Sequence, residues 1–213
     1  MSAHNLRREA DIARLQELAR QSGGRVELLD ASARVGRPIR IALHCRTAAS
    51  NAYPQSQQDG VTLRVDLPSR YPFERPVLTV ESRIFHPNIF ASGVICQGDK
   101  WLPAEGLDLL LKRIIRLVTF DPAHVNPASA ANRAAAAWYL QQRSRTPAAF
   151  PTDRVEFAGA GQAGASSATA VPGAATERVL RRCSVCGKGL RLPTGRRGLV
   201  DCPACGHEFD VST

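Results

Sequence analysis

The spacing of apolar residues predicts a helix near the start of the chain. Within residues 6–21, Ile12, Leu15 and Leu18 recur on one stripe of a helix, and charged side chains occupy the opposite side. The serine and two glycines of residues 22–24 then provide a stop signal. This pattern predicts an amphipathic helix with one buried face.

Four later segments have the pattern of short β-strands. Two of them alternate apolar with polar residues, which is the period of a strand with one buried face. Most links between the segments have hairpin length, so we expect an antiparallel meander. The four predicted strands cover residues 25–30, 39–43, 61–67 and 77–81.

Two more helices are expected after the strands. Residues 107–118 are apolar nearly all round for three turns, which predicts a buried helix. Residues 128–143 form an alanine-rich pattern with Trp138 and Tyr139 near its end. The order helix, meander, helix, helix predicts an α+β fold with helices over one face of an antiparallel sheet.

A change in composition divides the chain. From residue 146 to 175 the sequence is dominated by Ala, Gly, Ser, Thr and Pro, and such a segment buries too little apolar surface to offset its ordering entropy. We therefore expect a first domain at residues 1–146, a flexible linker at 147–177 and a small second domain at 178–213.

Composition and charge exclude two classes of protein. With 44% hydrophobic and 22% charged residues in 213, the chain is not wholly disordered. No apolar run approaches the roughly 18 residues that cross a bilayer, and the mixed charges of residues 1–20 do not fit a signal peptide. We expect no membrane association and a cytoplasmic protein. The net charge of +9 is spread along the chain, and the excess of arginine over lysine is typical of coding bias.

Four of the six cysteines have the spacing of metal ligands. Cys183 and Cys186 form one C-x-x-C pair, and Cys202 and Cys205 form another. In a reducing compartment this pattern predicts thiolate ligands rather than disulfides. Four thiolates favour one tetrahedral structural Zn²⁺, with iron as an alternative. The segment resembles a zinc ribbon.

The role of this second domain is less closely defined. Arginines surround the cysteine pairs, as expected for a surface that meets nucleic acid or an acidic protein. Phe209 is its only aromatic residue, so base stacking is poorly provided for. We favour protein recruitment over nucleic-acid binding.

Cys96 has a different setting, in which several motifs occur together. His86-Pro87-Asn88 lies ten residues before it, the tetrapeptide ending in the cysteine reads Gly-x-Ile-Cys, and a Tyr-Pro-Phe-x-x-Pro turn at residues 71–76 precedes both. A Trp-Leu-Pro triplet follows at residues 101–103. On these marks, residues 6–142 resemble the catalytic domain of ubiquitin-conjugating enzymes. The fusion to a ribbon and the lack of insertions favour a prokaryotic relative.

The resemblance implies a thioester chemistry at Cys96. A thiolate is nucleophilic enough to accept an acyl group and leaves easily when an amine attacks. In the family the asparagine, here Asn88, stabilises the oxyanion or orders the active-site loop. The histidine, here His86, has a structural role. Cys45 lies in an alternating strand, and we interpret it as a core residue.

Two departures from the family pattern concern the acceptor. Trp101 follows Cys96 by five residues rather than eight or more, so the intervening loop is short. The acidic residue that helps to position and deprotonate an incoming lysine is missing, or is replaced by Asn126 or His124. An imidazole can accept a proton near neutral pH, although an exposed loop histidine without a role fits equally well.

The implied partners are a ubiquitin-like modifier, its activating enzyme and a protein substrate. In the family the first helix docks on the activating enzyme, and here Arg7, Arg8 and Arg14 would meet an acidic surface. The alternative is a noncatalytic adaptor that binds a ubiquitin-like protein while the ribbon binds protein or nucleic acid.

Overall fold

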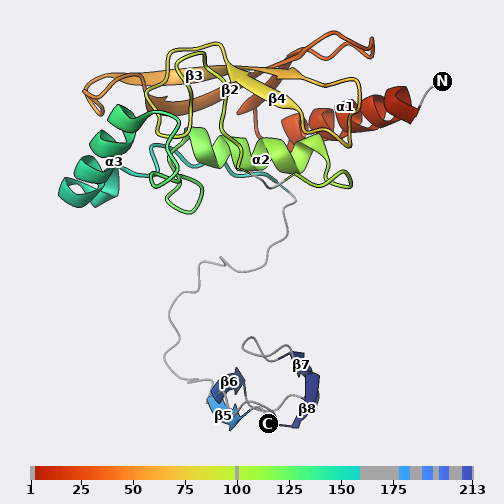
Figure 1. Cartoon of the computed structure of the whole chain (residues 1–213), viewed down its shortest axis with the longest axis vertical. Coiled ribbons are helices and arrows are strands. Elements are labelled where there is room, and N and C mark those ends of the chain that lie inside the picture. The colour runs from red at the N-terminus through yellow and green to blue at the C-terminus, as the bar shows by residue number, and fades with distance from the viewer. Residues whose placement is uncertain are drawn as a thin grey trace. The chain divides into compact units, whose positions relative to one another are not determined.

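The computed structural model describes residues 3–98 and 101–158 together with four strands between residues 178 and 212 (Figure 1). The chain divides into two compact units, Met1–Gly161 and Gln162–Thr213.

The first unit has the predicted α+β fold. Its four strands form one antiparallel sheet in the order β1-β2-β3-β4, which confirms the meander. Helix α1 precedes the sheet, and α2 and α3 follow it. The elements are α1 (Ala3–Gln21), β1 (Val26–Asp30), β2 (Ile39–Ala48), β3 (Gln57–Asp66), β4 (Val77–Val80), α2 (Leu107–Val118), α3 (Arg133–Arg145) and a 3-10 helix (Pro147–Ala149).

The main core lies between the sheet and two helices. Figure 1 shows α1 and α2 along one side of the sheet, and their apolar side chains pack against the inward-facing strand residues. Leu15 of α1, Leu63 of β3 and Leu111 of α2 are almost completely buried. The alternating pattern of the strands and the apolar stripe of the first helix therefore correctly predicted the core.

A second, aromatic cluster lies around α3. Phe120, Trp138, Tyr139 and Phe150 are all buried there. Helix α3 begins at Arg133 rather than at the predicted residue 128, because the Asn132 side chain accepts the N–H of Ala135 at 3.1 Å and caps the helix.

The segment after α3 corrects the predicted linker boundary. Residues 150–158 run back along the first unit, where Phe150 and Thr152 are buried. Thr152 donates from its amide to the Thr119 carbonyl at 2.8 Å, and the Ala158 amide donates to the Gln21 carbonyl at 2.8 Å. The averaged composition of residues 146–175 concealed these anchoring residues, so the predicted linker start at 147 is wrong.

In the second unit the structure describes two antiparallel hairpins. Strand β5 (Arg178–Arg182) pairs with β6 (Gly189–Pro193), and β7 (Arg197–Asp201) pairs with β8 (Glu208–Ser212). The four predicted metal ligands, Cys183, Cys186, Cys202 and Cys205, lie outside the described residues.

Candidate functional site

Cys96 ends a short irregular hairpin. The Phe90 amide donates to the Val94 carbonyl, and the Cys96 amide donates to the Asn88 carbonyl, both at 2.9 Å. Gly93 forms the turn with a φ of 85°. A Cβ there would lie 2.4 Å from the Val80 carbonyl oxygen, so both the φ angle and the close approach require glycine.

The hairpin is joined to the main sheet on its other side. Val80 donates to the Gly93 carbonyl at 2.8 Å, and Ile95 donates to the Leu78 carbonyl at 2.9 Å. The main chain just before Cys96 is thus hydrogen-bonded to both neighbours. Cys96 itself is partly exposed and has no disulfide partner. Cys96 belongs to neither of the two buried hydrophobic clusters of the first unit.

Asn88 joins this hairpin to the loop that precedes α3. Asn88 is 3% exposed. Its side-chain nitrogen donates to the carbonyls of Asn126 at 2.8 Å and Ser129 at 3.3 Å. Its side-chain oxygen accepts the Asn126 amide at 2.8 Å. Both N–H groups therefore hold the loop. Of the two roles that the resemblance implied, this geometry supports loop ordering over oxyanion stabilisation.

His86 is fully buried behind Asn88. Its Nδ1 accepts the Asn88 amide at 3.0 Å, and its ring lies 4.3 Å from that of Phe120, measured between centroids. Burial lowers the pKa of His86 to about 3, and a backbone contact with Leu117 opposes that shift only in part. The imidazole is therefore neutral near pH 7, which fits a structural acceptor.

The two predicted acceptor residues have different surroundings. Asn126 is exposed, and besides its two bonds to Asn88 its side chain accepts the Ser129 amide at 3.1 Å. His124 is partly buried, with its Nδ1 3.7 Å from an Asp121 carboxylate oxygen. Asn88 is thus hydrogen-bonded to Cys96 through its main chain and to Asn126 through its side chain, whereas His124 lies beside Asp121.

The predicted docking arginines of α1 are not equivalent. Arg8 is 1% exposed and donates to the carbonyls of Ser32 and Arg37. The prediction that it meets a partner is wrong, because its buried guanidinium donates to carbonyls of the chain itself. Arg7 donates to Asp11 at 2.6 Å and to the Pro103 carbonyl at 2.9 Å. The Arg14 side chain remains 50% exposed.

Sequence reasoning missed the side chains that hold the short loop after Cys96. Gln97 donates to the Pro76 carbonyl at 2.8 Å, and Arg75 donates to the Gly98 carbonyl at 2.6 Å. The Trp101 indole donates to the Pro72 carbonyl at 2.8 Å. The contacts of Gln97 and Arg75 form because the segment around Cys96 pairs with β4. Residues more than twenty positions apart then lie side by side, and no local sequence motif indicates this.

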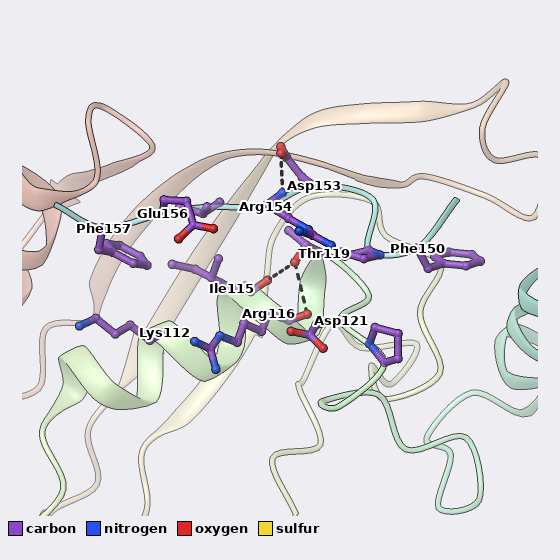
Figure 2. A pocket seen from close by; sticks show the side chains of 13 residues that line it. Lys112, Ile115, Arg116, Thr119, Asp121, Phe150, Asp153, Arg154, Glu156 and Phe157 are labelled. Atoms are coloured by element: carbon purple, nitrogen blue, oxygen red, sulfur yellow. Dashed lines mark hydrogen bonds between the residues drawn. The ribbon is translucent and has the colours of Figure 1, made fainter. Parts of the chain in front are cut away.

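One open groove of the first unit lies away from Cys96. It has a volume of about 580 Å³ and lies between α2 and residues 150–157. Figure 2 shows Lys112 and Arg116 on α2 with Glu156 across from them. None of the predicted catalytic residues lines this groove. Its charges are mixed, and they define no single ligand class.

The described residues contain neither a metal-binding cluster nor a membrane-spanning helix. No group of three or more His, Cys, Asp or Glu side chains there is arranged to hold a metal ion. Within the same residues, no helix has the length and apolar character needed to span a membrane.

Comparison with known proteins supports one family over part of the chain. Residues 57–150 match the family model described as ubiquitin-conjugating enzyme. Two relatives, both from African swine fever virus, carry the name ubiquitin-conjugating enzyme E2. The relative from strain Badajoz is 37% identical over 87 residues, which are 36% of this chain and 39% of the viral protein. The relative from a Kenyan isolate is 32% identical over 80 residues, or 30% of this chain and 37% of its own.

The extent of these matches is limited. This chain spans about two fifths of the length of the viral relatives. A solved structure titled S. cerevisiae Ubc12 is 21% identical, with a TM-score of 0.49 over 66% of this chain and 72% of that one. The family match includes Asn88, Cys96 and Asn126 but not α1.

Proposed function

We propose that this protein is a ubiquitin-conjugating enzyme that carries a ubiquitin-like modifier as a thioester on Cys96. One observation carries the proposal. A partly exposed cysteine ends a hairpin whose main chain is fixed to Asn88, inside the segment that matches the ubiquitin-conjugating family. A buried structural cysteine would not leave its sulfur accessible to a large acyl donor.

The proposed reaction has two acyl transfers. Cys96 sulfur attacks the thioester that joins the modifier to its activating enzyme, so one carbon–sulfur bond forms and another breaks. The proton of the Cys96 thiol ends on the released thiol of the activating enzyme. An acceptor amine then attacks the Cys96 thioester, a carbon–nitrogen bond forms, and the Cys96 thiolate leaves and takes up the proton that the amine loses.

Within this scheme Asn88 is a positioning residue. Its carbonyl holds the Cys96 amide, and its side chain holds the loop at residues 126–129. Asn126, exposed at the end of this contact, is the better placed of the two predicted acceptor residues. Its amide can orient an amine by hydrogen bonding but cannot act as a general base, so the proton of the amine must pass through another acceptor or water before it reaches the departing Cys96 thiolate.

A loading assay tests the thioester. The protein is mixed with a ubiquitin-like modifier, the cognate activating enzyme and ATP. We expect an adduct that dithiothreitol removes. Cys96→Ser should give an oxyester that resists the reductant, and Cys96→Ala should give no adduct, while the matched control Cys45→Ala loads normally. If no cognate pair gives an adduct, the protein is a noncatalytic adaptor instead.

We also propose that the exposed face of α1 docks the activating enzyme through Arg14. Its half-exposed guanidinium leaves it accessible, unlike the buried Arg8. Arg14→Glu should slow loading at subsaturating activating enzyme, and added salt should reduce the difference from the wild type. Equal loading rates at low salt would contradict this assignment.

For the second unit we propose one structural Zn²⁺ held by Cys183, Cys186, Cys202 and Cys205. Each cysteine pair falls in the sequence between two paired strands, because Arg182 is paired with Gly189 and Asp201 with Glu208. Four thiolates match the ligand preference of zinc, and the ion would stabilise a unit that has little core of its own. Protein recruitment remains the proposed role of this unit.

Metal analysis tests this site. Elemental mass spectrometry of the purified protein should give about one zinc per chain, and a double Cys183→Ser, Cys186→Ser variant should give none. The Cys45→Ala variant is the control and should retain the metal. A wild-type chain purified without zinc or iron would contradict the proposal.

A further inference from the structure

The segment that carries Cys96 is hydrogen-bonded to β4 in a constant register. Thr79 lies opposite Val94, with main-chain bonds from Val80 and Ile95 on either side of this pair. The same register continued by three residues would place residue 76 opposite residue 97. Cys96 lies between the last main-chain bond and that position.

A proline interrupts the ladder at this point. Pro76 has no N–H, so it cannot donate the bond that would continue the pairing beyond Cys96. Two side chains supply the contacts instead. Gln97 donates from its side-chain amide to the Pro76 carbonyl at 2.8 Å, and Arg75 donates from its guanidinium to the Gly98 carbonyl at 2.6 Å.

We propose that this pair of contacts, the Gln97–Arg75 clasp, positions Cys96 for transfer of its acyl group to an amine. The inference deepens the proposed function and rests on it. Main-chain bonds hold the segment before Cys96. After it, among the described residues, the clasp holds the positions that follow Cys96 directly, and the bond from the Trp101 indole to the Pro72 carbonyl lies further along the chain. A misplacement of the thioester by about 1 Å can cost on the order of 100-fold in rate, so a clasp next to the thiol affects transfer directly.

The clasp has a consequence that does not depend on a modifier. Loss of either contact frees the chain after Cys96, so the Cys96 amide should open from the Asn88 carbonyl more often. In Gln97→Ala and Arg75→Ala we expect hydrogen exchange of the Cys96 amide to be about tenfold faster, with Ile95 and Phe90 unchanged. The controls are Gln55→Ala and Arg83→Ala, which remove exposed side chains of the same two types.

The transfer assay compares two acceptors of the loaded thioester. Discharge to free lysine requires alignment and should fall about tenfold in Gln97→Ala and in Arg75→Ala. Discharge to hydroxylamine, which reacts without alignment, should stay within about twofold of the wild type. Arg75→Lys keeps a donor and should largely restore the lysine rate. The double alanine variant should discharge to lysine at a rate within about twofold of either single variant, because the two contacts act together.

Two results would overturn the clasp. One is unchanged exchange of the Cys96 amide in both alanine variants, and the other is an equal loss of lysine and hydroxylamine discharge, which would indicate general damage to the site. If the wild-type protein forms no thioester, the proposed function fails. The exchange experiment then still decides whether the clasp holds the Cys96 segment, and unchanged exchange overturns it.

Discussion

Cys45 and Cys96 show how two positions of one fold give the same residue opposite properties. Cys45 lies in β2, where it is 3% exposed and packs in the main core. Burial raises the pKa of Cys45 to about 12, and Asp153 adds to the shift while Arg25 opposes it. Cys96 lies at the end of an irregular hairpin and is partly exposed.

The difference comes from the backbone around each cysteine. Cys45 occupies an inward-facing position of the long strand β2, so its side chain packs in the main core. Cys96 follows a segment that is hydrogen-bonded to β4, and Pro76, which directly precedes β4, cannot donate the bond that would continue this pairing beyond Cys96. A position where a ladder ends can hold a thiol in a fixed place and still leave it accessible, which a position inside the sheet cannot.

Alkylation gives the largest expected contrast between the two thiols. At pH 8 a thiol with a pKa of about 12 is ionised roughly 10³-fold less than an ordinary thiol with a pKa near 8.5. Iodoacetamide should therefore modify Cys45 at least about 10³-fold more slowly in the native protein than in urea. Cys96 should react within about tenfold of its rate in urea.

Peptide mass spectrometry follows each cysteine separately. The Cys96→Ala variant serves as the control, because labelling of Cys45 should remain slow when the accessible thiol is absent. Similar native and urea rates for Cys45 would show that its region opens easily and would remove the contrast.

The next largest effect concerns Asn88, the buried polar residue whose carbonyl accepts the Cys96 amide. Asn88→Ala removes three side-chain hydrogen bonds and leaves their partners at Asn126 and Ser129 unmatched, so we expect a loss of about 3 kcal/mol in the free energy of unfolding. Asn88→Asp keeps the acceptor and should lose less. Urea unfolding measures both, with the exposed Asn51→Ala as the matched control. Equal stability of Asn88→Ala and Asn51→Ala would contradict this role.

Local sequence patterns predicted the regular elements well. In β2 and β3 buried and less buried residues alternate, and α2 is apolar on most of its surface. Both patterns depend on residues close together in the sequence, so they can be recognised without the structure. The start of α3 was misplaced because alanine-rich residues before Asn132 have helix propensity, but the cap and the loop bonded to Asn88 stop the helix there. Such tertiary bonds leave no periodic signal.

The candidate site was only partly predictable. The motif around Cys96 pointed to the cysteine, to Asn88 and to His86, because these residues lie close together in the sequence. The contacts of Arg75, Gln97 and Arg8 join residues at least 21 positions apart. They depend on strand register and on the path of a loop, which one sequence does not specify.

A pH experiment tests the rigid support behind Cys96. His86 has a pKa of about 3 in the folded chain and near 6.5 when unfolded, so the unfolded state takes up the proton first. Its contribution to stability is complete above about pH 6.5 and is lost as the pH falls towards 3. Between pH 7.5 and 5 we expect a loss of about 2 kcal/mol in the free energy of unfolding.

Urea unfolding at several pH values measures this loss. His86→Gln cannot ionise and should remove most of the pH dependence in that window. His44→Gln removes a half-exposed imidazole on β2 and should not change the pH dependence of the free energy of unfolding. An unchanged pH dependence in His86→Gln would assign the effect to other groups.

The smallest expected effect separates the two cysteines by packing alone. Cys45→Ala removes a buried sulfur from the core and should lower the free energy of unfolding by about 1 kcal/mol, because its neighbours cannot fill the space fully. Cys96→Ala removes a partly exposed sulfur and should stay within about 0.5 kcal/mol of the wild type. Both values come from urea unfolding of the full chain, with the transition followed by tryptophan fluorescence of the first unit. If Cys96→Ala were the more destabilising of the two, the sulfur of Cys96 would be a packing element, and the distinction between a core thiol and a reactive thiol would no longer hold.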